Sequence, residues 1–112
     1  MSTRHFRDQE FACHHCGVIV VRPELQQRLE VLRTICGNRP IRIIDGYRCP
    51  PHNRAVGGAP NSQHLYGAAA DIPSGISGIE AAHRAGFIGV GLSGAWVVHV
   101  DIRDGPRATW QY

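Results

Sequence analysis

Two histidines and one aspartate stand at positions where together they could hold a metal ion. His64 and Asp71 belong to the stretch Ser-Gln-His-Leu-Tyr-Gly-Ala-Ala-Ala-Asp, and His99 belongs to the later stretch Trp-Val-Val-His-Val-Asp. Imidazole nitrogens and carboxylate oxygens are common zinc ligands, and a site with three protein ligands keeps its fourth position open. An open position is typical of a catalytic zinc, so the sequence indicates metal-assisted chemistry.

The first of these segments has the composition of a tightly packed strand. Residues 67–72 are small and apolar, and Asp71 near their end would be costly to bury unless another charge compensated it. A bound metal ion would supply that charge. Gly67 allows the backbone to turn or to approach another segment closely between His64 and Asp71.

The second segment, residues 96–102, is rich in β-branched and aromatic side chains, which favours a strand. Side chains alternate between the faces of a strand, so His99 and Asp101 share one face. Taken alone, a His-x-Asp pair is usually structural, with the carboxylate orienting the imidazole or meeting solvent. The upstream segment makes the metal site the better interpretation.

These motifs resemble those of the zinc D-alanyl-D-alanine peptidases, the M15 family, which has the Hedgehog/DD-peptidase fold. The resemblance extends from about Phe6 to Trp110 and is strongest to short forms found in phage lysis enzymes and small bacterial cell-wall peptidases. It is carried by Ser62-x-His64-x-x-Gly67-x-Ala69-x-Asp71, by residues 96–101, by the Gly-Tyr-Arg segment within residues 45–53, and by residues 55–61.

The resemblance implies that His64, Asp71 and His99 are the ligands of one catalytic Zn²⁺. It also implies that Arg48 is a catalytic residue that binds a carboxylate or carbonyl oxygen of the substrate, a task that suits a planar guanidinium. Ser62 is expected to contact substrate. Without the resemblance, Arg48 would be interpreted as a surface arginine or as part of a structural ion pair.

The chain departs from the family pattern at one position. Many members carry an acidic residue or a histidine three positions before the last ligand, where it acts as general base, whereas this chain has Trp96. Asp101 is the nearest candidate for the catalytic base. Two roles remain open for it: accepting a proton from the activated water, or orienting His99.

Length and composition indicate one globular domain spanning residues 1–112. Hydrophobic residues make up 43% of the chain, which also contains 13 glycines and 7 prolines, as expected of a loop-rich globular domain. The net charge of +3 is mild and the arginines are scattered, which argues against nucleic-acid binding. We expect a monomer.

No targeting signal is apparent, because residues 1–8 lack an apolar region and no apolar run has the length of a membrane span. We expect the protein to be made in the cytoplasm and to act on the cell wall. A phage-lysin-like release or incorporation as a virion module would bring it there.

Four cysteines leave several alternatives open. Cys13 and Cys16 have the spacing of half a zinc knuckle, and Cys36 and Cys49 would complete a four-cysteine site only if the fold brought them together. Disulfides are a further option, although they are unusual without a signal peptide. Free thiols are the default expectation.

The predicted fold class is α+β, with an antiparallel sheet that bears the zinc site and helices packed on one side. Pro23 and Gly37 suit the start and end of a helix, and the leucines between them recur at helical spacing. The expected elements are strands at 17–21 and 41–44, helices at 23–36 and 76–85, a long loop at 50–63 with a helical turn at 53–56, a strand at 67–72, and a hairpin formed by 87–92 and 96–102.

The function predicted from these features is zinc-dependent hydrolysis of an amide bond in peptidoglycan stem peptides. The enzyme would be a D-Ala-D-Ala carboxypeptidase or a cell-wall endopeptidase, with peptidoglycan peptide as its partner and no nucleic acid. The alternative is a non-catalytic, zinc-containing cell-wall-binding module on the same fold, which Trp96 favours. A Cys/His zinc module built on residues 13–16 ranks last, because it lacks a second ligand pair.

Overall fold

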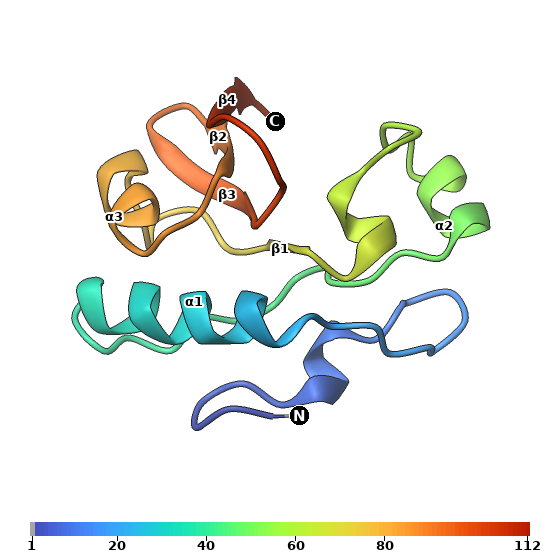
Figure 1. Ribbon diagram of the computed structural model, residues 1–112, viewed down its shortest axis with the longest axis horizontal. Coiled ribbons are helices and arrows are strands. Elements are labelled where there is room, and N and C mark those ends of the chain that lie inside the picture. Colours follow the sequence, from blue (N-terminus) through green and yellow to red (C-terminus); the bar gives the residue numbers. More distant parts are fainter. Residues whose placement is uncertain (1) are drawn as a thin grey trace.

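A four-stranded sheet organises the structure, a computed structural model that describes residues 2–112 (Figure 1). The strand order is β1-β3-β2-β4, and β3 pairs antiparallel with both β1 and β2. β4 instead runs parallel to β2, so the predicted purely antiparallel sheet is wrong at this edge and the sheet is mixed. The strands are β1 (Ala69–Asp71), β2 (Gly89–Ser93), β3 (Trp96–Asp101) and β4 (Ala108–Gln111).

Two helices complete the core beside this sheet. α1 (Pro23–Ile35) has Pro23 in its first turn and buries Leu25, Leu29 and Leu32, which confirms the helix predicted there. α3 (Ile79–Arg84) contacts α1, β2 and β3, and it is shorter than the predicted helix at 76–85. None of the helices in residues 2–112 has the length and apolar character needed to cross a bilayer.

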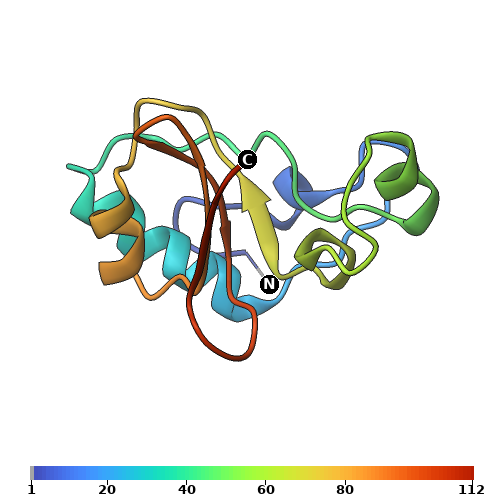
Figure 2. The same ribbon diagram turned by 90° about the horizontal axis from the view of Figure 1, so that it is seen from above.

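A second group of short helices lies on the other side of β1. Figures 1 and 2 both place α2 and the segment after it on the side of β1 away from α3 and the rest of the sheet. α2 (Pro50–Ala55) begins at the first of two prolines, earlier than the helical turn predicted at 53–56. The 3₁₀ helix η2 (Gln63–Tyr66) contacts α2, and a further 3₁₀ helix, η1 (Asp8–Phe11), lies in the N-terminal segment.

Two of the predicted strands do not form. Residues 17–21 run as irregular chain, with the side chains of Val18, Ile19 and Val20 exposed, so their β-branched composition gave a wrong prediction. Residues 41–44 form no strand; the Ile44 N–H bonds to the Asp71 carbonyl oxygen at 2.8 Å, and an isolated bridge joins Asp45 to Asp71. That bridge nevertheless fixes the residues before Arg48 against the end of β1.

Candidate metal centre

A short reversal of the chain places His64 close to β1. The Ser62 hydroxyl accepts a hydrogen bond from the His64 backbone N–H at 3.2 Å and so caps η2. Gly67 then ends η2 with a left-handed φ of 66°, and a Cβ there would lie 2.5 Å from the Val20 carbonyl oxygen. Both roles expected of Gly67, a turn and a close approach, are confirmed.

Strand pairing brings the third residue to the same place. In the β1–β3 ladder Asp71 lies directly opposite His99, so two residues far apart in sequence become neighbours. The hairpin of β2 and β3, which holds His99 from the other side, forms as predicted. The pairing register, which no single motif contains, therefore assembles the site.

The donor atoms of His64, Asp71 and His99 converge. The Asp71 Oδ1 atom lies 3.2 Å from His64 Nε2 and 3.1 Å from His99 Nδ1, and all three donors lie within 4.8 Å of one another. Four ligands at zinc's usual bond lengths of about 2.0–2.1 Å stand roughly 3.3 Å apart in a tetrahedron. The donor set and its spacing therefore fit a zinc ion with three protein ligands.

The imidazole nitrogens that face away from Asp71 each have a hydrogen-bond partner. His64 Nδ1 donates to the Gly46 carbonyl oxygen at 2.6 Å, and His99 Nε2 lies 2.8 Å from Asp101 Oδ2. Such partners fix the tautomer and ring orientation of metal-binding histidines. Both histidines thus present their other nitrogen toward Asp71.

Asp101 lies behind His99 and is fully buried. Both of its oxygens are occupied, because Arg103 donates to Oδ1 at 2.9 Å and to Oδ2 at 2.7 Å while His99 meets Oδ2. These contacts favour the orienting role over the catalytic base, the two alternatives that the sequence left open. The catalytic role of Asp101 stays a prediction.

Neighbouring charges keep both carboxylates ionised. Burial raises the pKa of Asp71, but hydrogen bonds and charge from His64 and His99 outweigh it and hold that pKa well below its usual range. Burial also raises the pKa of Asp101, but the hydrogen bonds from Arg103 and His99 and the charge of His99 outweigh burial and hold that pKa well below its usual range. Two buried anions beside two imidazoles make this region receptive to a cation.

Gly89 provides the space for Asp101. It lies opposite Asp101 in the β2–β3 ladder, and a Cβ at residue 89 would stand 2.2 Å from Asp101 Oδ2. We expect Gly89→Ala to lower the free energy of unfolding by about 1–3 kcal/mol through overpacking and to weaken zinc binding. Gly78→Ala is the matched control, because nothing lies within 4 Å of a Cβ there. Equal denaturant midpoints for the two variants would contradict the proposed fit.

Arg48 connects Asp71 of this cluster to several neighbouring residues. Its guanidinium donates to Asp45 Oδ2 at 2.6 Å, to Asp71 Oδ2 at 3.3 Å, to Asn53 Oδ1 at 3.4 Å and to the Tyr112 hydroxyl at 3.2 Å. Two ionised partners compensate its charge, so it can remain largely buried. The side chain is therefore held in one orientation before any ligand arrives.

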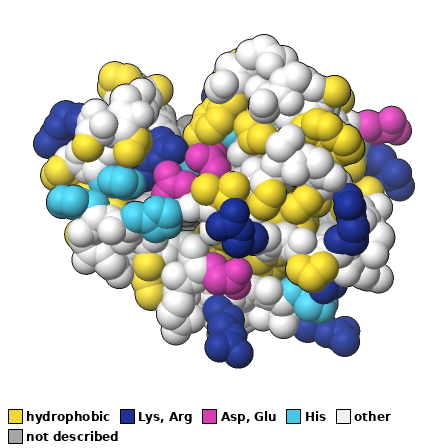
Figure 3. Space-filling view, turned by 180° about the vertical axis from the view of Figure 1, so that it is seen from behind, with side chains coloured by type: hydrophobic (Ala, Val, Ile, Leu, Met, Phe, Trp, Pro, Cys, Tyr) yellow, Lys and Arg dark blue, Asp and Glu magenta, His cyan; other side chains and the backbone are white. Residues whose placement is uncertain are grey.

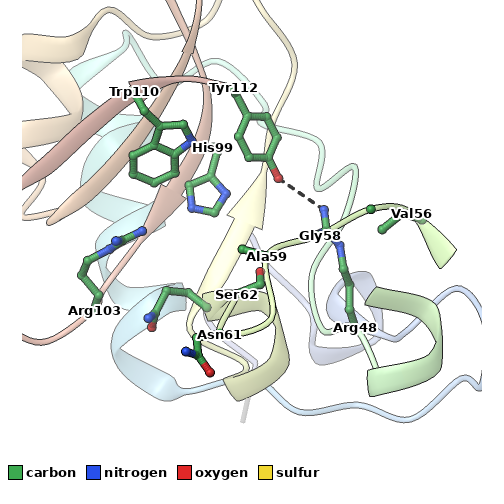
Figure 4. A pocket seen from close by; sticks show the side chains of 12 residues that line it. Arg48, Val56, Gly58, Ala59, Asn61, Ser62, His99, Arg103, Trp110 and Tyr112 are labelled. Carbon is green, nitrogen blue, oxygen red and sulfur yellow. Dashed lines mark hydrogen bonds between the residues drawn. The ribbon is translucent and has the colours of Figure 1, made fainter. Parts of the chain in front are cut away.

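A cavity of about 530 Å³ opens beside the cluster. Figure 4 shows His99, Arg103, Trp110 and Tyr112 along its sheet side, facing the loop that carries Ser62. Among the described residues that line it there is no aspartate or glutamate, whereas Arg48 and Arg103 are present. Both arginines are paired with carboxylates that do not line the cavity, Arg48 with Asp45 and Asp71 and Arg103 with Asp101.

Trp110 and Tyr112 are site residues that the sequence interpretation missed. The Tyr112 hydroxyl donates to Asp71 Oδ2 at 3.0 Å, and the Trp110 ring centroid lies 5.1 Å from that of His99 and 4.8 Å from the Arg103 guanidinium carbon. Burial and the nearby Asp71 charge raise the pKa of Tyr112 to about 12, so its hydroxyl stays a donor at neutral pH. The sequence shows that Trp110 and Tyr112 are two positions apart, but it does not show the parallel pairing of β4 with β2 that brings them to the cavity.

The structure brings most of the predicted site residues together. His64, Asp71 and His99 form the donor cluster, and Arg48 and Ser62 line the cavity. Trp96, at the position where the resemblance led us to expect a base, is 45% exposed and does not line this cavity.

Comparison with known proteins finds a family and a relative that this chain resembles. The family model described as Peptidase M15 matches residues 4–101. The zinc D-Ala-D-Ala carboxypeptidase of Streptomyces albus G is 39% identical over 90 residues, which cover 74% of this chain and 35% of that protein. The matched region therefore spans only about a third of the relative's length.

Proposed function

Because the chain belongs to the peptidase M15 family, we propose that it is a zinc-dependent peptidase that hydrolyses an amide bond in peptidoglycan stem peptides. The observation that carries the proposal is the convergence of His64, Asp71 and His99 next to a cavity. The zinc carboxypeptidase among its relatives supports the same chemistry.

Each residue of the site has a role in this reaction. A zinc ion held by His64, Asp71 and His99 would act as a Lewis acid on the scissile carbonyl and would activate water. Arg48 lines the cavity, where it would bind the substrate carboxylate or carbonyl oxygen by exchanging one of its present hydrogen bonds.

Residues around this centre orient and enclose it. Asp101 holds the His99 ring in position through Nε2. The Tyr112 hydroxyl stays protonated and donates to Asp71 Oδ2. The other oxygen, Oδ1, is therefore left to face the two histidines. Ser62 lines the cavity and holds the turn that carries His64.

Defined muropeptides analysed by mass spectrometry test the proposal. We expect a product whose mass shows cleavage within the stem peptide, loss of that product after exhaustive chelation, and recovery when Zn²⁺ is added back. The mass also identifies the bond, and so distinguishes terminal D-Ala removal from endopeptidase cleavage. Full hydrolysis by metal-free protein would overturn metal catalysis.

The second candidate function is a non-catalytic, zinc-containing module that binds cell-wall peptides. It is favoured by the absence of any carboxylate among the described residues that line the cavity and by the exposed Trp96. Such a module would bind zinc and muropeptide with no release of amine over long incubation.

Asp101→Asn tests how this carboxylate acts. If it orients His99, zinc affinity and hydrolysis should both fall by about 10–100-fold, because loss of such a partner weakens the ligand itself. The measurements are zinc titration with a competing chelator and initial rates at saturating zinc. Unchanged zinc affinity with loss of hydrolysis would instead identify Asp101 as the base.

We also propose that the protein works on the cell wall after release in the manner of a phage lysin or as part of a larger particle. The mild positive charge of the chain, +3, suits association with anionic wall polymers.

A further inference from the structure

A second cluster of metal-binding side chains lies outside the cavity. The sulfur atoms of Cys13, Cys16 and Cys49 lie within 4.8 Å of one another, and all four cysteines of the chain are free thiols. Sulfurs around a tetrahedral zinc at its usual bond length of about 2.3 Å stand roughly 3.8 Å apart. Three converging sulfurs are thus close to the arrangement that one soft metal ion requires.

The backbone around these sulfurs has the form of a thiolate site. The segment from Cys13 to Gly17 turns back on itself, with the Gly17 N–H bonded to the Cys13 carbonyl at 2.8 Å and with a left-handed φ of 75° at Gly17. The Cys49 N–H donates to the Cys13 sulfur at 3.4 Å.

A fourth donor is available from His15, whose Nδ1 atom lies 3.5 Å from the Cys49 sulfur. Its ring stacks on that of His52, with centroids 6.2 Å apart and an interplanar angle of 7°. His15 is exposed, so a small side-chain rotation toward the sulfurs meets little resistance. Three cysteines and one histidine form a common structural zinc set.

A neighbouring group of nitrogen and oxygen donors is a weaker candidate. The donor atoms of His14, Asp45 and His52 lie within 4.8 Å of one another. Figure 3 shows histidine side chains beside acidic ones on one face of the molecule. Oδ2 of Asp45 is already bonded to Arg48, however, which leaves only Oδ1 of that carboxylate, and His14 is exposed. The thiol cluster has no such competing ion pair.

From this arrangement we infer that Cys13, Cys16 and Cys49 bind a second, structural zinc ion, with His15 as the fourth ligand. The site would tie the N-terminal segment to the start of α2. Cys49 directly follows Arg48, so the ion would also hold the backbone of the substrate-binding arginine. Cys36, the other cysteine that the sequence offered for such a site, lies at the end of α1 and is not part of the cluster.

Cobalt substitution distinguishes the two sites, because only a thiolate ligand gives sulfur-to-cobalt charge-transfer absorption. We expect reduced wild-type protein titrated with Co²⁺ to develop this near-ultraviolet absorption. His64→Ala should keep it, since that variant loses only a nitrogen ligand elsewhere. Cys16→Ser should lose it, and Cys36→Ser is the matched control that should retain it in full.

Thermal unfolding gives a second measurement. Metal ions that bind only the folded state stabilise it, so Zn²⁺ should raise the Tm of His64→Ala through the thiolate site and should raise that of the double variant His64→Ala/Cys16→Ser less. Cys16 is the exposed member of the cluster, so its replacement by serine disturbs packing least.

Wild-type protein with four titratable thiols and no charge-transfer absorption would overturn the inference, whatever the variants do. Loss of the absorption in Cys36→Ser, or its survival in folded Cys16→Ser, would also contradict it. None of these outcomes depends on hydrolysis, so the thiolate site and the proposed peptidase activity stand or fall separately.

Discussion

Replacing His64 by alanine is expected to lower the rate of stem-peptide hydrolysis by at least about 10⁴-fold, because a catalytic metal ion supplies several kcal/mol of transition-state stabilisation. His64 is fully buried, and its Nε2 atom meets both Asp71 and the Tyr112 hydroxyl. Without it, the cluster keeps one imidazole and one carboxylate, too few to retain zinc in competition with solvent. Initial rates and bound zinc should be measured on the same preparation.

The matched control is His83→Ala, which removes a histidine from α3, away from the cavity. That variant should hydrolyse substrate at the wild-type rate. Circular dichroism must show that His64→Ala is folded, since a buried side chain is lost. A folded His64→Ala protein that retains both zinc in this centre and its hydrolytic rate would exclude His64 as a ligand.

Replacing Arg48 by lysine is expected to lower kcat/KM by about 10²–10³-fold on peptides with a free terminal carboxylate, equivalent to roughly 2.7–4 kcal/mol. Lysine preserves the positive charge between Asp45 and Asp71 but cannot form the planar bidentate pair of a guanidinium. Alanine would leave two buried carboxylates uncompensated and would confuse loss of stability with loss of binding.

Peptides with a free or an amidated C-terminus separate the two tasks open to Arg48. A loss confined to the free acid indicates carboxylate binding and terminal cleavage, whereas equal losses indicate a carbonyl contact and favour an endopeptidase. Arg107→Lys, at an exposed residue outside the cavity, is the control and should leave both rates unchanged. If Arg48→Lys also leaves both unchanged, this arginine has no part in substrate binding.

The parts of the site that the sequence predicted are those encoded locally. The periodic leucines of α1 and the paired β-branched segments around Gly94 determine a helix and a hairpin from short-range information. His64, Asp71 and His99 were recognised because their residue types and spacing are informative before any contact is known. Their convergence still required the β1–β3 register.

What could not be predicted depends on contacts between distant segments. Residues 41–44 have a strand-like composition, yet they form no strand in the folded protein. Only the next residue, Asp45, makes a β-bridge, to Asp71. The parallel pairing of β4 with β2 brings Trp110 and Tyr112 to the cavity, and no turn signal announces a crossover of that kind. Cys49 lies beside Cys13 in the folded chain and Cys36 does not, and sequence spacing alone could not distinguish the two.

Anomalous scattering from crystals of the zinc-loaded protein, collected at the zinc absorption edge, would locate the metal among the side chains of its proposed ligands. We expect a peak about 2.0–2.2 Å from His64 Nε2, an Asp71 carboxylate oxygen and His99 Nδ1, next to the cavity that Arg48 and Tyr112 line. Zinc-saturated crystals with no peak among these three side chains would contradict this expectation.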